Sequence, residues 1–274
     1  MLKRILQLGV FIFLTVLTQV GGIIYVLSFL TYSPIHKYFQ HSKTRTLFKI
    51  GAFIFLYLFF TFLIIPIIAK PFGRIPLPIV KTTNLCPLTP FTVILNRHYV
   101  RPALKEAALQ VAVAMNKKYP NTEINYLDGN FPFINKFPLL PHLSHNDGKK
   151  LDLAFCYKER KTNLYTNECP SFLGYGICEE PNADEINTAA FCSKNGYWQY
   201  SFLTYLIPQS NKANFLFDVE KTKELVWLLS EQEAIGKIFI EPHLKERMQL
   251  RSEKIKFHGC QAVRHDDHIH IQLK

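Results

Sequence analysis

The stretch RHDDHIHIQL, Arg264 to Leu273, ends in the alternation of polar and apolar residues that is typical of a β-strand. Residues two apart in a strand share a face, so Ile269 and Ile271 would point into a hydrophobic core. His268 and His270 would then lie together on the opposite face. Two imidazoles on one face of a strand are well placed to reach one metal ion or one substrate.

A second polar cluster precedes another strand pattern. The residues Asn-Asp-Gly at 146–148 favour a turn, and alternating apolar residues at 151–155 predict a strand. Asp152 would lie at the start of this strand, on the face opposite the apolar side chains. The turn would fold His145 back toward Asp152.

The other patterns predict helices and strands without a regular βαβ alternation, which favours an α+β fold. Pro102 begins a helical pattern that ends before Tyr119, and a second helix is expected from Lys221 to Ile235, closed by Gly236. Strands are expected at 123–127, 151–157, 237–240 and 268–273.

Charge is distributed very unevenly along the 274 residues, whose formal net charge is +11. Residues 1–105 contain no Asp or Glu, whereas residues 106–274 are close to neutral. The basic residues form no stripe interleaved with aromatic side chains, so we expect no nucleic-acid partner. A hydrophobic content of 48% excludes an intrinsically disordered chain.

Two apolar stretches in the N-terminal third are long enough to cross a bilayer as helices. They are Ile5–Leu30 and Ile50–Ala69, and a basic linker joins them. Residues 1–70 therefore predict a multi-pass anchor with the lipid bilayer as a partner. Residues 71–90 are rich in proline and predict an extended tether, and residues 91–274 would form the folded domain.

All six cysteines follow the second apolar stretch, and none lies in a CxxC pair. An even set of widely spaced cysteines suits disulfides in an oxidising compartment, so we expect an extracytoplasmic domain. Six buried free thiols are the alternative. No cysteine stands in a recognisable nucleophile context, which disfavours a Cys-His protease. Cys260 lies five residues before His265, where a disulfide would brace the polar cluster.

Two motifs together resemble a known family. His145, Gly148 and Asp152 match H-x-x-G-x-x-x-D, and residues 268–270 match H-x-H. In this order they resemble the signatures of the zinc peptidases grouped with lysostaphin, D-Ala-D-Ala carboxypeptidases and hedgehog-type domains. Residues 265–270 and 238–242 are most similar to the penicillin-insensitive murein endopeptidase branch. The resemblance covers about 139–155 and 237–273, not the apolar stretches, and implies an antiparallel-sheet peptidase-like domain.

The resemblance implies that His145, Asp152 and His270 bind Zn²⁺ and leave a fourth position for water. Two imidazoles and one carboxylate are a donor set found in catalytic zinc sites. His268 would act as general base or stabilise the tetrahedral intermediate, and His265 would assist.

Two positions depart from the family pattern. Asp267 stands where the carboxypeptidase branch has a glutamate, and its shorter side chain ranks it below His268 as the base. Ser144 lies one residue before the first histidine, where some members have a serine two residues before it.

The function implied is that of a zinc metallopeptidase anchored in the bacterial cytoplasmic membrane, which hydrolyses an amide bond in a peptidoglycan peptide crosslink. The crosslink, the choice between endopeptidase and carboxypeptidase, and the oligomeric state stay open. One alternative is a non-hydrolytic zinc-binding receptor or scaffold on the membrane. Another is a disulfide-stabilised membrane protein without a metal.

Overall fold

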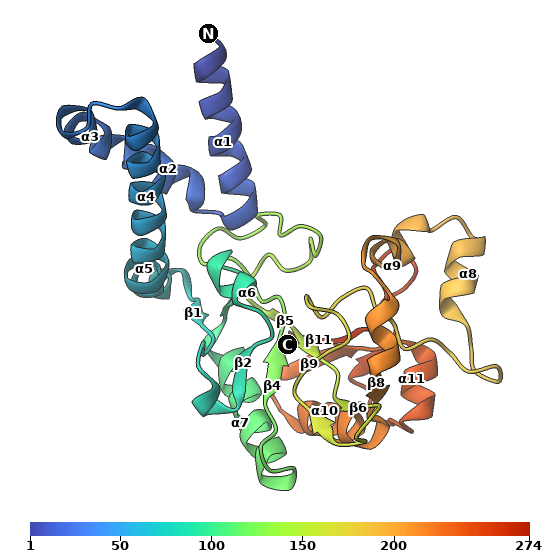
Figure 1. The fold of residues 1–274 in the computed structure, drawn as a ribbon. Helices are drawn as coiled ribbons and strands as arrows, with labels where there is room; N and C mark the ends of the chain where they lie inside the picture. The colour runs from blue at the N-terminus through green and yellow to red at the C-terminus, as the bar shows by residue number, and fades with distance from the viewer.

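A six-stranded mixed sheet forms the centre of the larger part of the molecule (Figure 1). The computed structural model describes residues 1–274. The strand order is β10-β9-β11-β5-β4-β2. In chain order the strands are Leu85–Pro87 (β2), Ile124–Tyr126 (β4), Lys150–Ala154 (β5), Ile235–Phe239 (β9), Ile255–Lys256 (β10) and His268–Leu273 (β11). Four strands are mutually antiparallel, whereas β2 and β10 run parallel to their neighbours. The α+β prediction is therefore confirmed, with a sheet that is mixed at both edges.

The pairing of β5 with β11 determines where the polar residues meet. His270 pairs with Asp152, and His268 pairs with Ala154, in the antiparallel ladder. Paired residues on adjacent strands place their side chains on the same face of a sheet. His270 and Asp152 are therefore direct neighbours, and His268 lies two residues along on that face. The predicted strand 268–273 is confirmed at both ends.

Two long helices pack on the apolar face of this sheet, α7 (Pro102–Lys118) and α10 (Val219–Glu231). The inward residues of α7 and β11 belong to one cluster of 30 buried residues. Ile269 and Ile271 are fully buried there, as the strand pattern predicted. A truncation such as Ile271→Ala would cost about 2–5 kcal/mol in a core of this kind. The polar face therefore rests on a rigid support.

The second predicted helix ends earlier than expected, at Glu231. Ile235 and Gly236 belong to β9, and the pairing of β9 with β11 shifts register beside them, between Gln272 and Leu273. A Cβ atom at Gly236 would lie 3.1 Å from the Cα atom of Lys274. This glycine therefore permits a close strand approach and does not close a helix.

Shorter elements surround the central sheet. A three-stranded antiparallel sheet contains Tyr157–Glu159 (β6), Tyr165–Thr166 (β7) and Phe215–Phe217 (β8). The predicted strand 151–157 is thus divided between β5 and β6. The helices here are Pro90–Ile94 (α6), Thr188–Lys194 (α8), Phe202–Leu206 (α9) and Pro242–Arg247 (α11).

The proline-rich segment is packed on the domain over much of its length, although the sequence predicted an extended tether. Ile75–Pro76 (β1) pairs with Tyr99–Val100 (β3), and β2 forms one edge of the central sheet. Leu77 and Leu85 are buried in the main core. Their apolar side chains gain more from burial than from exposure in a free linker. The folded domain therefore begins before residue 91.

The apolar stretch Ile5–Leu30 does not form one helix. It is divided into Leu2–Thr18 (α1) and Gly21–Ser28 (α2), with Gln19 in a positive-φ conformation between them. Helix α2 folds back along α1, and a Cβ atom at Gly22 would lie 2.6 Å from the carbonyl oxygen of Phe11. Only glycine fits that approach. The sequence showed the glycines but not the turn that they permit.

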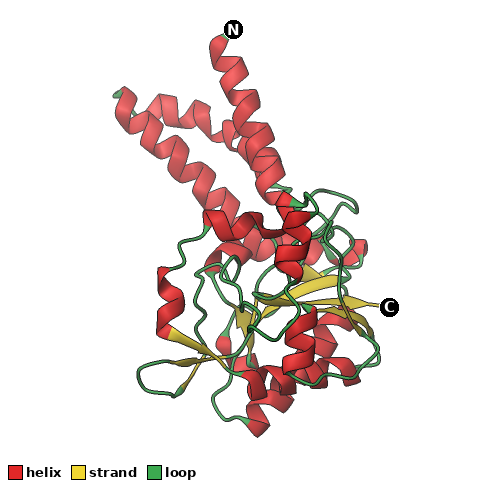
Figure 2. Cartoon of the chain, turned by 90° about the vertical axis from the view of Figure 1, so that its right-hand side faces the viewer, coloured by secondary structure: helices red, strands yellow, loops and turns green.

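One helix of the chain, Ser42–Ile68, is long and apolar enough to cross a membrane by length and composition. It comprises Ser42–Phe59 (α4), a π-helical turn at Phe60–Ile64 and Ile65–Ile68 (α5). Tyr32–Tyr38 (α3) precedes it. Helices α1 and α4 project from the same side of the domain in both views (Figures 1 and 2). The sequence predicted two membrane spans, whereas the structure contains one helix that is a candidate span.

Candidate metal centre

Three donor atoms converge on the polar face of the central sheet. The Nε2 atom of His145 lies 3.1 Å from Nδ1 of His270 and 3.3 Å from Oδ1 of Asp152. The distance from His270 Nδ1 to Asp152 Oδ1 is 2.8 Å. Tetrahedral zinc with bonds of about 2.0–2.1 Å requires donors about 3.3 Å apart. The donor set predicted from the sequence is therefore brought together with spacings close to those that a zinc ion needs.

A hydrogen bond at Nδ1, the ring nitrogen that does not face the other donors, fixes the orientation of His145. Its Nδ1 atom lies 2.8 Å from the carbonyl oxygen of Gly129. A carbonyl oxygen only accepts, so Nδ1 carries the proton and the Nε2 lone pair faces Asp152 and His270. Metal-binding histidines commonly use their second nitrogen in this way.

A hydrogen bond to Oδ2 fixes the orientation of the Asp152 carboxylate. The hydroxyl group of Tyr175 donates to Oδ2 at 2.8 Å, which leaves Oδ1 directed at the two histidines. Burial alone would raise the pKa of Asp152, but His145, His268 and His270 lower it well below its ordinary value. The carboxylate is therefore ionised, and its negative charge suits a cation.

The pKa values of the two histidines in the donor set, His145 and His270, are shifted in opposite directions. Desolvation lowers the pKa of His270 to about 4, so this imidazole is neutral and able to act as a ligand. Burial also opposes protonation of His145, but the charge of Asp152 outweighs it and raises the pKa of His145. A divalent cation at this position would take the place of that proton.

The loop that carries His145 connects β4 to β5 and is held by residues from the N-terminal part of the chain. The guanidinium group of Arg74 is fully buried and donates to the carbonyl oxygen of Phe131, to Asn135 Oδ1 at 2.6 Å and to the carbonyl oxygen of Asn146 at 3.3 Å. Gly148 has φ 81° and lies in a bend at residues 147–148, within the turn predicted at 146–148. Its glycine is needed because that backbone conformation disfavours a side chain.

His268 lies beside the three donors. Its Nε2 atom is 3.7 Å from Asp152 Oδ1, while its Nδ1–H donates to the carboxylate of Asp267. Asp267 accepts a second hydrogen bond from the backbone nitrogen of Gly176 at 2.6 Å. Burial opposes protonation of His268, but the charges of Asp152 and Asp267 raise its pKa to about 9. Asp267 thus orients His268 and does not itself reach the donor triangle.

His265, the third residue predicted to take part in catalysis, is fully buried 5.0 Å from the ring of His268, centroid to centroid. Its Nδ1 atom has no hydrogen-bond partner. Burial and the neighbouring imidazoles lower its pKa well below the ordinary value. The donors of His265, His268 and His270 also lie within 4.8 Å of one another, so His270 belongs to two possible metal groups. Only the group with Asp152 includes a charge that compensates the metal.

Sequence reasoning missed part of the supporting network. His142, which belongs to neither motif, is buried with its Nδ1 atom 3.2 Å from Asp128 and 3.6 Å from Asp152. Arg97 lies 3.3 Å from the same Asp128 carboxylate. Tyr175 comes from an irregular stretch in which no periodicity marks an inward side chain. Only the three-dimensional fold reveals these contacts.

A cleft of about 530 Å³ opens onto the metal-binding residues. Its lining also includes Leu143, Ser144, Trp198 and Phe202, and no Lys or Arg lines it. The disulfide Cys192–Cys260 connects α8 to the segment that follows β10, next to the cleft residues 261–263. The expected disulfide next to the site is confirmed.

The sequence predicted disulfides at all six cysteines. For the four cysteines other than Cys192 and Cys260 this prediction is wrong. Cys86, Cys156 and Cys178 are buried free thiols, and Cys169 is a half-buried one. Burial raises the pKa of Cys86 to about 11 and that of Cys156 to about 12. These thiols therefore behave as small apolar groups, the alternative that the sequence left open.

No protein-family model matches the chain, and a search of curated proteins finds no match. The resemblance to zinc peptidases thus rests on the two sequence motifs, and the geometry adds that their side chains could hold a metal ion.

Proposed function

We propose that this chain is a membrane-anchored zinc peptidase that hydrolyses an amide bond in a peptide crosslink of peptidoglycan. The observation that carries the proposal is the triangle formed by His145, Asp152 and His270, with His268 next to it. A purely structural zinc site is normally closed by four protein ligands. Here three donors face a cleft, and a basic side chain lies beside them.

Zinc bound by the three donors would lower the pKa of a coordinated water toward neutrality and polarise the carbonyl group of the substrate. The positive charge of the zinc would oppose protonation of His268, whose Nε2 could then take a proton and return it to the leaving nitrogen. Asp267 would hold the Nδ1–H and keep Nε2 directed at the site. The neutral ring of His265, 5.0 Å from that of His268, would assist it.

The location proposed is the bacterial cytoplasmic membrane, with the domain on its outer side. The helix Ser42–Ile68 supports a membrane anchor, and the disulfide Cys192–Cys260 supports an oxidising compartment. Helices α1 and α2 would complete the membrane part as the second apolar segment. The packed segment 75–87 would hold the cleft close to the membrane surface.

The test compares zinc content and hydrolysis for matched histidine variants of the full chain in detergent. Zinc is measured by mass spectrometry, and hydrolysis by chromatography of crosslinked muropeptides. His145→Ala should lose zinc and activity together. His268→Ala should keep zinc and lose about 10² to 10⁴-fold in rate. His41→Ala, at an exposed position before α4, is the matched control and should change neither.

Three results would contradict the assignment. If wild-type protein contains no zinc when purified without chelator, the metal proposal is wrong. If it binds zinc but cleaves no crosslinked muropeptide, the non-hydrolytic receptor or scaffold becomes the better interpretation. Loss of zinc from His268→Ala, with zinc retained by His145→Ala, would instead assign the metal to the group of His265, His268 and His270.

A further inference from the structure

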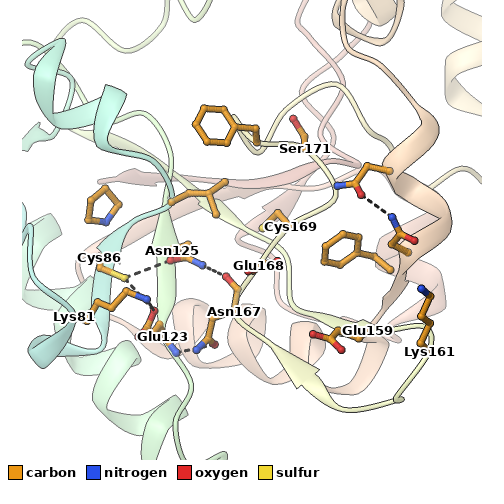
Figure 3. Close-up of a pocket in the computed structure, with 16 residues that line it drawn as sticks. Lys81, Cys86, Glu123, Asn125, Glu159, Lys161, Asn167, Glu168, Cys169 and Ser171 are labelled. Atoms are coloured by element: carbon orange, nitrogen blue, oxygen red, sulfur yellow. Dashed lines mark hydrogen bonds and ion pairs between the residues drawn. The ribbon is translucent and has the colours of Figure 1, made fainter.

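A second hollow, of about 790 Å³, lies apart from the metal centre and shares none of its lining residues. Figure 3 shows it between the strands β2 and β4 and the segment that contains β6 and β7. Lys81, Cys86 and Glu123 line one side, and Glu159 and Lys161 lie across from them (Figure 3). Its volume is in the range of small-molecule pockets.

The charges of this pocket nearly cancel. Two lysines and three glutamates line it, and Lys81 is paired with Glu123 at 2.9 Å. No arginine is present, so a phosphate or a nucleic acid would find no bidentate partner. Only five of the 16 lining residues are hydrophobic, which disfavours a lipid chain. The lining therefore suits a neutral, polar ligand.

Asparagine is the most frequent residue type of the lining, and the fold holds these amide side chains in place. Asn125 donates to the carbonyl oxygen of Asn167, whose own side-chain oxygen accepts from the backbone nitrogen of Glu123 at 3.1 Å. Asn214 donates to Asn211 at 2.9 Å, and Asn211 donates to the carbonyl oxygen of Pro170 at 2.7 Å. These bonds fix the amides without using all of their capacity. The Asn125 oxygen, for example, accepts only from the Cys86 thiol, at 3.4 Å.

One hydroxyl group of the lining lacks any partner. Ser171 is 5% exposed, and its Oγ atom makes no hydrogen bond within the protein. A buried hydroxyl without a partner is costly, so such groups usually bind water or a ligand. The Oγ atom itself has less than 1 Å² of accessible surface, so Ser171 is a polar part of the pocket wall and not a direct contact for a ligand.

Phe172 follows Ser171 and provides an apolar surface at the same pocket. Its side chain is 67% exposed, although its ring packs edge-on against Phe91 at a centroid distance of 6.0 Å. A sugar ring has one C–H face that packs on an aromatic ring and a rim of hydroxyl groups that bond to amides. An exposed aromatic ring beside fixed amides therefore matches a saccharide better than it matches an ion or a lipid.

We propose that this pocket binds a neutral saccharide, with Phe172 against one face of a sugar ring and Asn125 and Asn214 bonding its polar groups. The proposal does not depend on the metal centre. It would give the protein a second contact with a glycan-containing surface.

The experiment measures binding of chitotetraose and cellotetraose to the full chain by isothermal titration calorimetry. A polyoxyethylene detergent is used, because a sugar-based detergent would compete. Saturable binding of at least one oligosaccharide is expected. Asn214→Ala removes an exposed amide of the lining, and Phe172→Ala truncates an exposed ring, so both variants should fold. Each should weaken binding about two- to tenfold, the range for one lost contact of this kind.

Phe191→Ala is the matched control, because Phe191 is 63% exposed but lies on α8, away from this pocket. It should bind like wild type, as should His145→Ala and wild type in EDTA. Failure of wild type to bind either oligosaccharide would overturn the proposal, as would wild-type affinity in both Asn214→Ala and Phe172→Ala. Loss of binding in EDTA would place the sugar at the metal centre instead and also contradict it.

Discussion

The side-chain oxygen of Gln19 lies 2.8 Å from the backbone nitrogen of Phe133, and this bond joins the break between α1 and α2 to the loop that carries His145. Gln19 is buried, and its positive φ directs the chain into α2. Arg74, just after the candidate membrane span, holds the same loop at Phe131, Asn135 and Asn146. The apolar N-terminal part and the metal centre are therefore connected through one loop.

We predict that Arg74→Lys weakens zinc affinity by about 10–100-fold, the usual effect of changing a group that supports a metal ligand. Lysine cannot reproduce three directed bonds, so the loop that carries His145 would lose its fixed position. The measurement is zinc affinity by competition with a fluorescent chelator. Arg160→Lys is the matched control, since Arg160 also donates to backbone carbonyl groups, those of Ala213 and Phe215. Equal zinc affinity in the two variants would contradict the prediction.

Asp267→Asn tests whether Asp267 orients His268. The asparagine oxygen can still accept from Gly176, but the charge beside His268 is lost. Zinc content should stay at the wild-type level, because Asp267 is not among the three donors. The rate of crosslink hydrolysis should fall about tenfold or more, since a general base depends on its protonation state and direction. The comparison uses zinc analysis and single-turnover rates on the same preparations.

Two outcomes would separate a positioning role from a ligand role. Loss of zinc in Asp267→Asn would make Asp267 part of the metal set, whereas an unchanged rate would remove its role in orienting His268. The variant His268→Ala and the double variant Asp267→Asn/His268→Ala should hydrolyse crosslinks at similar rates, because Asp267 acts only through His268.

Local patterns predicted the two strands of the metal centre well. The alternation in 268–273 and the turn at 146–148 fix which side chains share a face, and the antiparallel pairing then brings His270 next to Asp152. Both patterns depend on neighbouring residues only. The motif histidines could therefore be placed before the fold was known.

Contacts between distant segments could not be predicted in this way. Hydropathy alone does not distinguish a straight span from the hairpin at Gln19, because the difference lies in close contacts at Gly22. The proline-rich segment has a composition typical of linkers, yet Leu77 and Leu85 find a place in the core. Whether two cysteines form a disulfide depends on their distance in the folded chain, which their spacing in the sequence does not show. Of the disulfides that the sequence predicted, only Cys192–Cys260 is present.

Glu241 is expected to make stability fall as pH rises. It is 2% exposed and accepts from the backbone nitrogen of His265 at 3.2 Å. Burial, with the nearby charge of Asp266, raises its pKa from 4.5 to about 7. The folded state therefore holds a proton that the unfolded state releases between those values. Stability from this group should be lost across that window, by roughly 3 kcal/mol.

Glu241→Gln should flatten this pH dependence, because glutamine keeps an acceptor for His265 and does not ionise. The free energy of unfolding is compared at pH 5 and pH 8 in EDTA, so that the metal contributes to neither protein. The variant should gain stability relative to wild type at pH 8 and little at pH 5. An equal change with pH in both proteins would show that Glu241 is ionised throughout.

Reduction of Cys192–Cys260 should destabilise the domain and loosen the cleft. The two cysteines are 68 residues apart, and closing a loop of that length stabilises a fold by about 4 kcal/mol in the chain-entropy treatment. Cys260 precedes the cleft residues 261–263, while Cys192 lies in the helix before Trp198, so the bond connects two walls of the cleft. Dithiothreitol should lower the melting temperature of wild type but not that of the Cys192→Ser/Cys260→Ser variant.

Thiol labelling of the unfolded, unreduced protein should count four reactive cysteines, since Cys86, Cys156, Cys169 and Cys178 are free. A count of six would show that the bond is absent in the isolated protein, and a count of zero would show that the remaining four pair as well.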